Sequence, residues 1–181
     1  MKKTLMAVAL ATTLAAPSLL ANVYVQGDLG YSRTKIEDYK KNRFEPRLSV
    51  GYQLQDFRLA LDYTYYRNIN YSYNNGYIGN KELKTNGIGF SMIYDIPVQS
   101  ELKPYVGTRL AINRLKLTDT RVGNYSSYSN TNLGYGLVAG VTYPLAQNLK
   151  LNAGVEYNHL GRIDDTNVRN YGAKVGLRYD F

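Results

Sequence analysis

Strict alternation of apolar and polar residues is the feature that most constrains how this chain folds. Successive side chains of a β-strand point to opposite faces, so alternation indicates a strand with one apolar face. The final segment shows the pattern without interruption. Its apolar positions are Tyr171, Ala173, Val175, Leu177, Tyr179 and Phe181, and the other face carries Asn170, Gly172, Lys174, Gly176, Arg178 and Asp180.

The same pattern recurs along the chain. We predict eight strands, at about 23–33, 44–54, 57–66, 85–96, 102–114, 132–145, 149–159 and 170–181. Each has about the length that a tilted membrane-spanning strand needs. Short connections near 55–56, 97–101 and 146–148 alternate with longer ones, which is typical of outer-membrane barrels. The predicted fold is all-β: one eight-stranded antiparallel up-and-down transmembrane β-barrel over residues 22–181.

Alternation does not say which face points inward, because a soluble barrel keeps its apolar face inside. Glycines gather on the polar face, where an eight-stranded barrel leaves room only for packed side chains. Aromatic residues lie mostly toward the ends of the apolar segments, as in the two girdles of a membrane barrel. We therefore predict that the apolar face contacts lipid.

Residues 1–21 are predicted to be a secretory signal peptide. Lys2 and Lys3 precede an apolar stretch from Leu5 to Ala16, and a small-residue region ends at Ala21. Cleavage after Ser18 is the alternative, and a membrane anchor is disfavoured because the stretch barely approaches the length of a spanning helix. The chain has no cysteine, which excludes disulfides, a thiol nucleophile and thiolate zinc sites.

The positive charge is concentrated in the predicted loops. Removal of Lys2 and Lys3 lowers the formal charge from +8 to +6. The predicted loops at 34–43, 67–84, 114–131 and 160–169 hold twelve basic and six acidic residues, which accounts for the whole excess. This pattern is read as a solvated basic rim or as a surface for lipopolysaccharide phosphates or an acidic partner. Nucleic acid is not an expected partner. The candidate rim residues are Lys35, Lys40, Lys41, Arg43, Lys81, Lys84 and Arg121.

Charges of both signs occupy the polar face of the predicted strands. Buried charges persist only when they are paired, so we expect an ion-pair network inside the barrel. A plug of side chains is favoured over a conducting pore. The network residues are Arg47, Arg58, Lys103, Arg109, Lys150, Lys174 and Arg178 with Asp28, Glu45, Asp62, Asp95, Glu156 and Asp180.

The predicted loop 67–84 is rich in Tyr, Asn and Gly. Antibody paratopes use the same residues, because tyrosine gives contact area at low entropic cost and asparagine adapts its hydrogen bonds. A solvated loop with an Asn-Gly turn is the alternative. The candidate recognition residues are Tyr71, Tyr73, Asn74, Asn75 and Tyr77.

Catalytic and cofactor signals are sparse. His159 is the single histidine of the chain, and it lies near the end of a predicted strand. Outer-membrane lipid A deacylases place a serine two residues after such a histidine, but Gly161 stands there. Asp164 and Asp165 are adjacent in a loop and point apart, so they make a poor cation site. We expect no catalytic site, metal or cofactor.

Several segments resemble the opacity family of outer-membrane proteins, especially its small neisserial surface protein A type. They are 23–26, Lys103–Arg109, Gly136–Val141, Tyr157-Asn158 and Leu160-Gly161. The chain end, with Lys174, Gly176, Tyr179 and Phe181, resembles the signal that the barrel-assembly machinery reads. The resemblance implies an outer-membrane barrel with extracellular loops and periplasmic termini.

The resemblance also implies a function. Adhesive opacity proteins engage host receptors or sulfated glycans, and the small surface-protein type is associated with a complement regulator. We therefore expect a non-enzymatic surface-interaction protein that contacts lipopolysaccharide and host molecules. A small diffusion porin is the first alternative, and a lipid-modifying enzyme around His159 is the second.

Overall fold

The computed structural model describes residues 22–36, 39–74, 78–121, 124–163 and 166–181. The predicted signal peptide, 1–21, lies outside the described residues. No helix in the described part of the chain is long and apolar enough to span a membrane. The strands are β1 (Val23–Ile36), β2 (Tyr39–Leu54), β3 (Phe57–Asn74), β4 (Ile78–Asp95), β5 (Lys103–Arg121), β6 (Asn124–Pro144), β7 (Leu149–Ile163) and β8 (Thr166–Asp180).

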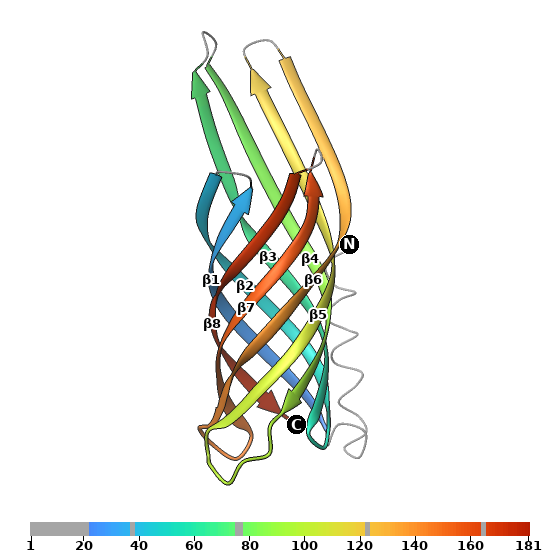
Figure 1. Ribbon diagram of the computed structural model, residues 1–181, viewed down its shortest axis with the longest axis vertical. Coiled ribbons are helices and arrows are strands. Elements are labelled where there is room, and N and C mark those ends of the chain that lie inside the picture. Colours follow the sequence, from blue (N-terminus) through green and yellow to red (C-terminus); the bar gives the residue numbers. More distant parts are fainter. Residues whose placement is uncertain (1–21, 37–38, 75–77, 122–123, 164–165) are drawn as a thin grey trace, which may run out of the picture.

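The eight strands form one closed antiparallel barrel. Each strand pairs with its sequence neighbours, and β8 closes the barrel on β1 from Tyr24–Asp180 to Ile36–Val168. Three connections and the C-terminus lie at one end, which we call the turn end (Figure 1). The other four connections lie at the hairpin end. The predicted fold class is confirmed.

The strands rise to two heights at the hairpin end. The β3–β4 and β5–β6 hairpins extend far beyond the β1–β2 and β7–β8 hairpins (Figure 1). The β4–β5 ladder reaches Gly79–Arg121, whereas the β2–β3 ladder ends at Arg47–Thr64 and the β6–β7 ladder ends at Tyr135–His159. A four-stranded sheet, β3 to β6, therefore continues above the closed barrel. We call this part the tall sheet.

The tall sheet corrects the predicted loop boundaries. Residues 67–84 and 114–131 were expected to be loops, but most of them belong to strands β3 to β6. Residues 34–36, 39–43, 160–163 and 166–169 likewise form the upper parts of strands β1, β2, β7 and β8. The reason is that main-chain pairing between adjacent strands continues even where the outer face is no longer apolar.

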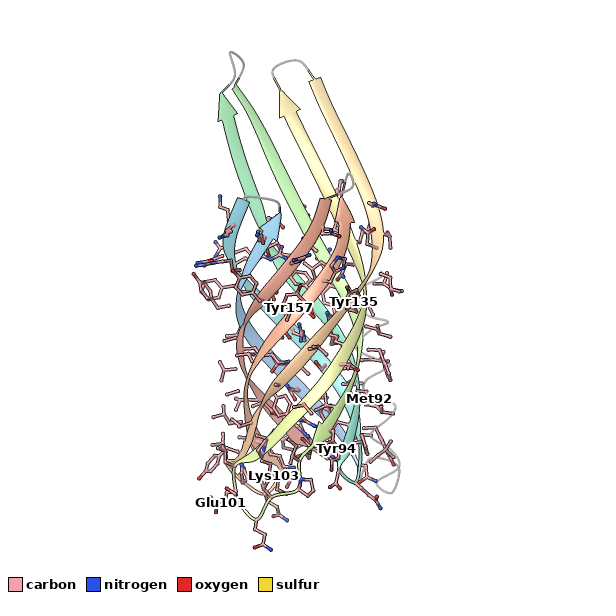
Figure 2. The ribbon with its side chains drawn as sticks, in the orientation of Figure 1. Met92, Tyr94, Glu101, Lys103, Tyr135 and Tyr157 are labelled. Atoms are coloured by element: carbon pink, nitrogen blue, oxygen red, sulfur yellow. The ribbon has the colours of Figure 1, made fainter. Side chains whose placement is uncertain are left out.

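The alternation sorts side chains as predicted. Outward positions are exposed and apolar, as at Leu29 and Leu133 (63% and 70% exposed), whereas inward positions such as Asp62 and Arg109 are buried. Aromatic rings flank this apolar wall, with Tyr135 and Tyr157 toward the hairpin end and Tyr94 toward the turn end (Figure 2). The apolar face is thus the outer face, which is the face a membrane barrel presents to lipid.

Two irregularities in strand pairing lie near the upper end of the lumen. The β3–β4 register shifts between Tyr66 and Ile69, and the β7–β8 register shifts between His159 and Gly161. Gly161 has a φ of 118°, a conformation that favours glycine. Leu160 keeps the inward parity of Asn158 and packs with Tyr66 and Val168 in a fully buried cluster. We call these three residues the lumen lid.

Candidate recognition surface

The predicted recognition residues lie at the top of the tall sheet. Tyr71 and Tyr73 are on β3, where their backbones pair with Lys81 and Gly79 of β4, and Asn74 is the last residue of β3. Asn75 and Tyr77 lie outside the described residues. The β3–β4 pairing thus carries Tyr71 and Tyr73 to the upper part of the tall sheet, above the β1–β2 and β7–β8 hairpins (Figure 1).

The predicted basic rim divides into two groups. Lys35, Lys40 and Lys41 are exposed at the top of the β1–β2 hairpin, and Lys84 is exposed on β4. The backbones of Lys81 and Arg121 lie higher, in the tall sheet. The structure therefore does not bring the rim residues together in one patch.

Arg43 does not belong to the rim, which corrects the prediction. Its side chain is buried inside the barrel, where Nε lies 3.3 Å from Glu45 Oε1. The guanidinium also lies 4.5 Å from the ring centre of Tyr66. The physical reason is parity: position 43 shares the inward face of β2 with Glu45 and Arg47.

The predicted ion-pair network fills the middle of the lumen. Asp62 is its centre, because it accepts hydrogen bonds from Arg109 Nε at 2.9 Å and from Thr64 Oγ1 at 2.9 Å. Arg47 donates to both carboxylate oxygens of Glu156 at 2.8 Å, and its Nε lies 3.7 Å from Asp62. These side chains are at most 7% exposed. Packed charges therefore occupy the cross-section of the barrel.

A blind cavity opens at the turn end. Its volume is about 570 Å³, and Gln53, Lys103 and Lys150 are among its lining residues. Two of its lining residues form ion pairs: Asp95 Oδ1 lies 2.7 Å from Arg58 Nη2, and Arg178 Nη2 lies 2.6 Å from Asp180 Oδ1. Sequence reasoning placed these charges in the lumen but gave no sign of the cavity, because its size depends on the loop 96–102.

His159 faces outward near the top of the wall. Its ring stacks on Tyr135 with centroids 5.0 Å apart, and Nε2 lies 3.2 Å from Asn167 Oδ1. Gly161, two residues further, is buried and offers no nucleophile. In the described part of the chain, no group of three His, Asp or Glu residues could hold a metal ion. The surroundings of His159 are those of an interfacial aromatic residue.

The residues of the predicted assembly signal have structural positions of their own. Lys174 lies in the lumen, with Nζ 3.8 Å from Glu156 Oε2, and Gly176 leaves room for Asp28. The rings of Tyr179 and Phe181 meet edge to face, 5.2 Å apart, on the outer wall at the turn end.

The family assignment rests on a match between the sequence and a protein-family model over most of the barrel. The model described as "Opacity family porin protein" matches residues 50–181. The chain belongs to the opacity family. Protein opa of Haemophilus influenzae (strain ATCC 51907 / DSM 11121 / KW20 / Rd) is 42% identical over 132 residues, which cover 73% of this chain and all of that relative. Opacity protein opA67 of Neisseria gonorrhoeae is 29% identical and covers 87% of this chain and 96% of its own length.

Solved structures agree with this assignment. The crystal structure of neisserial surface protein A superposes with a TM-score of 0.73 at 36% identity, covering 88% of this chain and 97% of that one. Ail of Yersinia pestis, in complex with the heparin analogue sucrose octasulfate, has a TM-score of 0.62 and 19% identity over 87% and 98% of the two chains. The second likeness shows the fold alone. This opacity-family protein is an outer-membrane β-barrel, as its sequence predicted.

Proposed function

We propose that this opacity-family barrel is a non-enzymatic surface-recognition protein of adhesin type. The tall sheet carries the proposal, because it lifts the Tyr- and Asn-rich tip of β3–β4 beyond the apolar wall. In this proposal the hairpin end is extracellular, both ends of residues 22–181 are periplasmic, and residues 1–21 are removed on export. Lys174, Gly176, Tyr179 and Phe181 then serve the barrel-assembly machinery during insertion.

The proposed partners are host molecules at the tall sheet and lipopolysaccharide at the rim. A host receptor, a sulfated glycan or a complement regulator fits the tyrosines of the tip together with nearby cations such as Lys81 and Arg121. The complex of Ail with a heparin analogue supports the sulfated glycan, since Ail shares this fold.

Whole-cell binding tests the proposal. Cells expressing the protein are compared with the variant Tyr71→Ser/Tyr73→Ser/Tyr77→Ser for binding to heparin-coated wells, epithelial cells and serum proteins. The matched control is Tyr125→Ser/Tyr128→Ser, which removes tyrosines from the neighbouring tall hairpin. We expect the first variant alone to lose binding at equal surface level. Equal binding by all three strains would refute recognition by this tip.

Diffusion through the lumen is the second candidate function, and the description of the family as porins favours it. The packed network and the lumen lid argue against it, because Tyr66, Leu160 and Val168 are at most 1% exposed. We therefore infer that the lumen does not conduct. Planar-bilayer recording decides between the two, as described in the Discussion.

A further inference from the structure

Three exposed cations form a row across the outer face of β2, β1 and β8. Lys40 lies directly opposite Lys35 in the β1–β2 ladder, and Lys35 lies opposite Arg169 in the β1–β8 ladder. Directly opposed like charges destabilise a sheet. Within the described residues none of the three has a carboxylate at ion-pair distance. The row therefore favours an anion from outside the protein.

Arg33 extends this cation row toward the membrane. Its Nε donates a hydrogen bond to Asn42 Oδ1 at 2.9 Å, and Asn42 Nδ2 donates to the Tyr31 hydroxyl at 2.9 Å. Tyr31 packs against Phe44 with ring centroids 5.2 Å apart. These contacts hold the guanidinium at the edge of the apolar wall, where its terminal nitrogens match the fork geometry of a phosphate.

A hollow lies further down the same two strands. It has a volume of about 500 Å³, and its lining consists of the outward positions Gly27, Leu29, Leu151, Val175 and Leu177 together with the inward positions Asp28, Arg47 and Gly176. Gly27 faces outward, and a Cβ added to it would meet no atom within 4 Å. Ala173, which pairs with Tyr31, has a short side chain and therefore protrudes little from the outer face between the hollow and Arg33. The outer face of β1 and β8 thus combines cations above with a depression below whose lining is mainly Gly, Leu and Val.

The spacing matches a lipid of the outer leaflet. Gly27 is eight residues from Lys35, or about 27 Å along the strand at about 3.4 Å per residue. A tilt of about 40° reduces this to about 21 Å along the membrane normal. That depth covers a headgroup and one leaflet of a hydrocarbon core about 30 Å thick.

A second group of exposed cations in the described part of the chain lacks this combination. Arg67, Arg114 and Lys116 are exposed on β3 and β5. Beneath them, however, Ile88 and Ile112 stand out from the wall at 63% and 59% exposure. The second cluster therefore offers charge without a depression for an alkyl chain.

We propose that Lys35, Lys40 and Arg169, with Arg33, bind the phosphates of an outer-leaflet phosphoglycolipid of lipid A type, and that one acyl chain lies in the hollow at Gly27. The proposal rests on the extracellular placement of the hairpin end in the proposed function. It specifies Lys35 and Lys40 as the part of the basic rim that contacts the lipid. A soluble sulfated glycan is the competing ligand, but the site faces sideways, on the same face as the apolar wall.

The test measures binding of diphosphorylated lipid A to the folded protein in nanodiscs of neutral phospholipid. Lys35→Gln/Lys40→Gln/Arg169→Gln should weaken binding about 100-fold, because each cation contributes about fivefold. The matched control Arg67→Gln/Arg114→Gln/Lys116→Gln removes equal charge from the second group and should change binding less than about threefold. Gly27→Leu fills the hollow without changing charge and should weaken binding several-fold.

Three results would overturn the proposal. Equal losses in both triple variants would show diffuse electrostatic attraction, and unchanged binding by Gly27→Leu would remove the acyl chain from the hollow. Binding of a heparin fragment but not of lipid A would make the row a glycan site. Migration of unboiled samples on gels verifies that each variant folds. Host binding is tested separately with the tyrosine variants, which leave this lipid site intact. A failure of the proposed function can therefore be distinguished from a failure of the lipid site.

Discussion

Replacement of Asp62 by Asn should destabilise the barrel strongly. The carboxylate is buried and faces Arg109, whose side chain is 1% exposed, and Arg47 lies 3.7 Å away. Asn keeps the volume but removes the negative charge, which leaves the Arg109 guanidinium without its counter-ion. Breaking a buried pair in this way costs about 3–5 kcal/mol of unfolding free energy. With a urea m-value of about 2 kcal/mol/M, the unfolding midpoint should fall by about 1.5–2.5 M.

The assay is a urea titration of protein folded into lipid vesicles, with the folded fraction read from unboiled gel migration. Lys150→Gln is the matched control, because Lys150 Nζ lies 2.8 Å from Asp180 Oδ2 in a pair that is 34% and 23% exposed. An exposed pair contributes about 1 kcal/mol or less. Equal midpoint shifts for the two variants would refute the argument that burial makes the lumen pair critical.

A double variant separates the cost of breaking the pair from the net contribution of the pair. Asp62→Leu/Arg109→Met replaces both partners by apolar side chains and leaves no unpaired charge at these two positions. Such exchanges are often nearly neutral. We therefore expect the double variant to recover most of the stability that Asp62→Asn loses.

Further predictions concern packing, conduction and chemistry. Gly51→Ala should lower the unfolding free energy by about 1–3 kcal/mol in the same titration, because its Cβ would meet the ring of Tyr24, whereas Gly27→Ala should have no effect. The protein should show no steady open level in planar bilayers, since packed side chains fill the lumen; a stable open level would restore the porin interpretation. Replacement of His159 by Phe should leave the lipid A mass spectrum of overexpressing cells unchanged, because Gly161 supplies no nucleophile; a changed spectrum would favour the enzyme.

The barrel could be predicted because the alternation of inward and outward side chains is a local property of the sequence. Alternation placed Asp62 and Arg109 in the lumen and Leu177 on the apolar face, and the structure confirms each of them. Arg43 was misplaced even though it shares the parity of Glu45, because its segment was read as a loop. The same alternation, carried two residues further, would have placed it inside.

The heights of the hairpins were not predictable in the same way. The sequence of β3 does alternate beyond Thr64, with Ile69, Tyr71 and Tyr73 interleaved with Asn and Ser. Its richness in Asn and Gly near the tip nevertheless resembles a loop, and only the pairing with β4 distinguishes the two. Alternation does place Leu160 inward, since it shares the parity of Glu156 and Asn158, but it gives no sign of the register shift at Gly161.

The unequal ladders divide this protein into two regions of different cooperativity. Below the Arg47–Thr64 and Tyr135–His159 pairs every strand has two partners, so an amide there exchanges its hydrogen only when the barrel opens. Above Thr64 on β3, and at positions 124–134 on β6, one side of each strand lies beyond the end of a ladder. Such edges open locally at low free energy. Sequence changes in the tall sheet therefore disturb the stability of the closed barrel little.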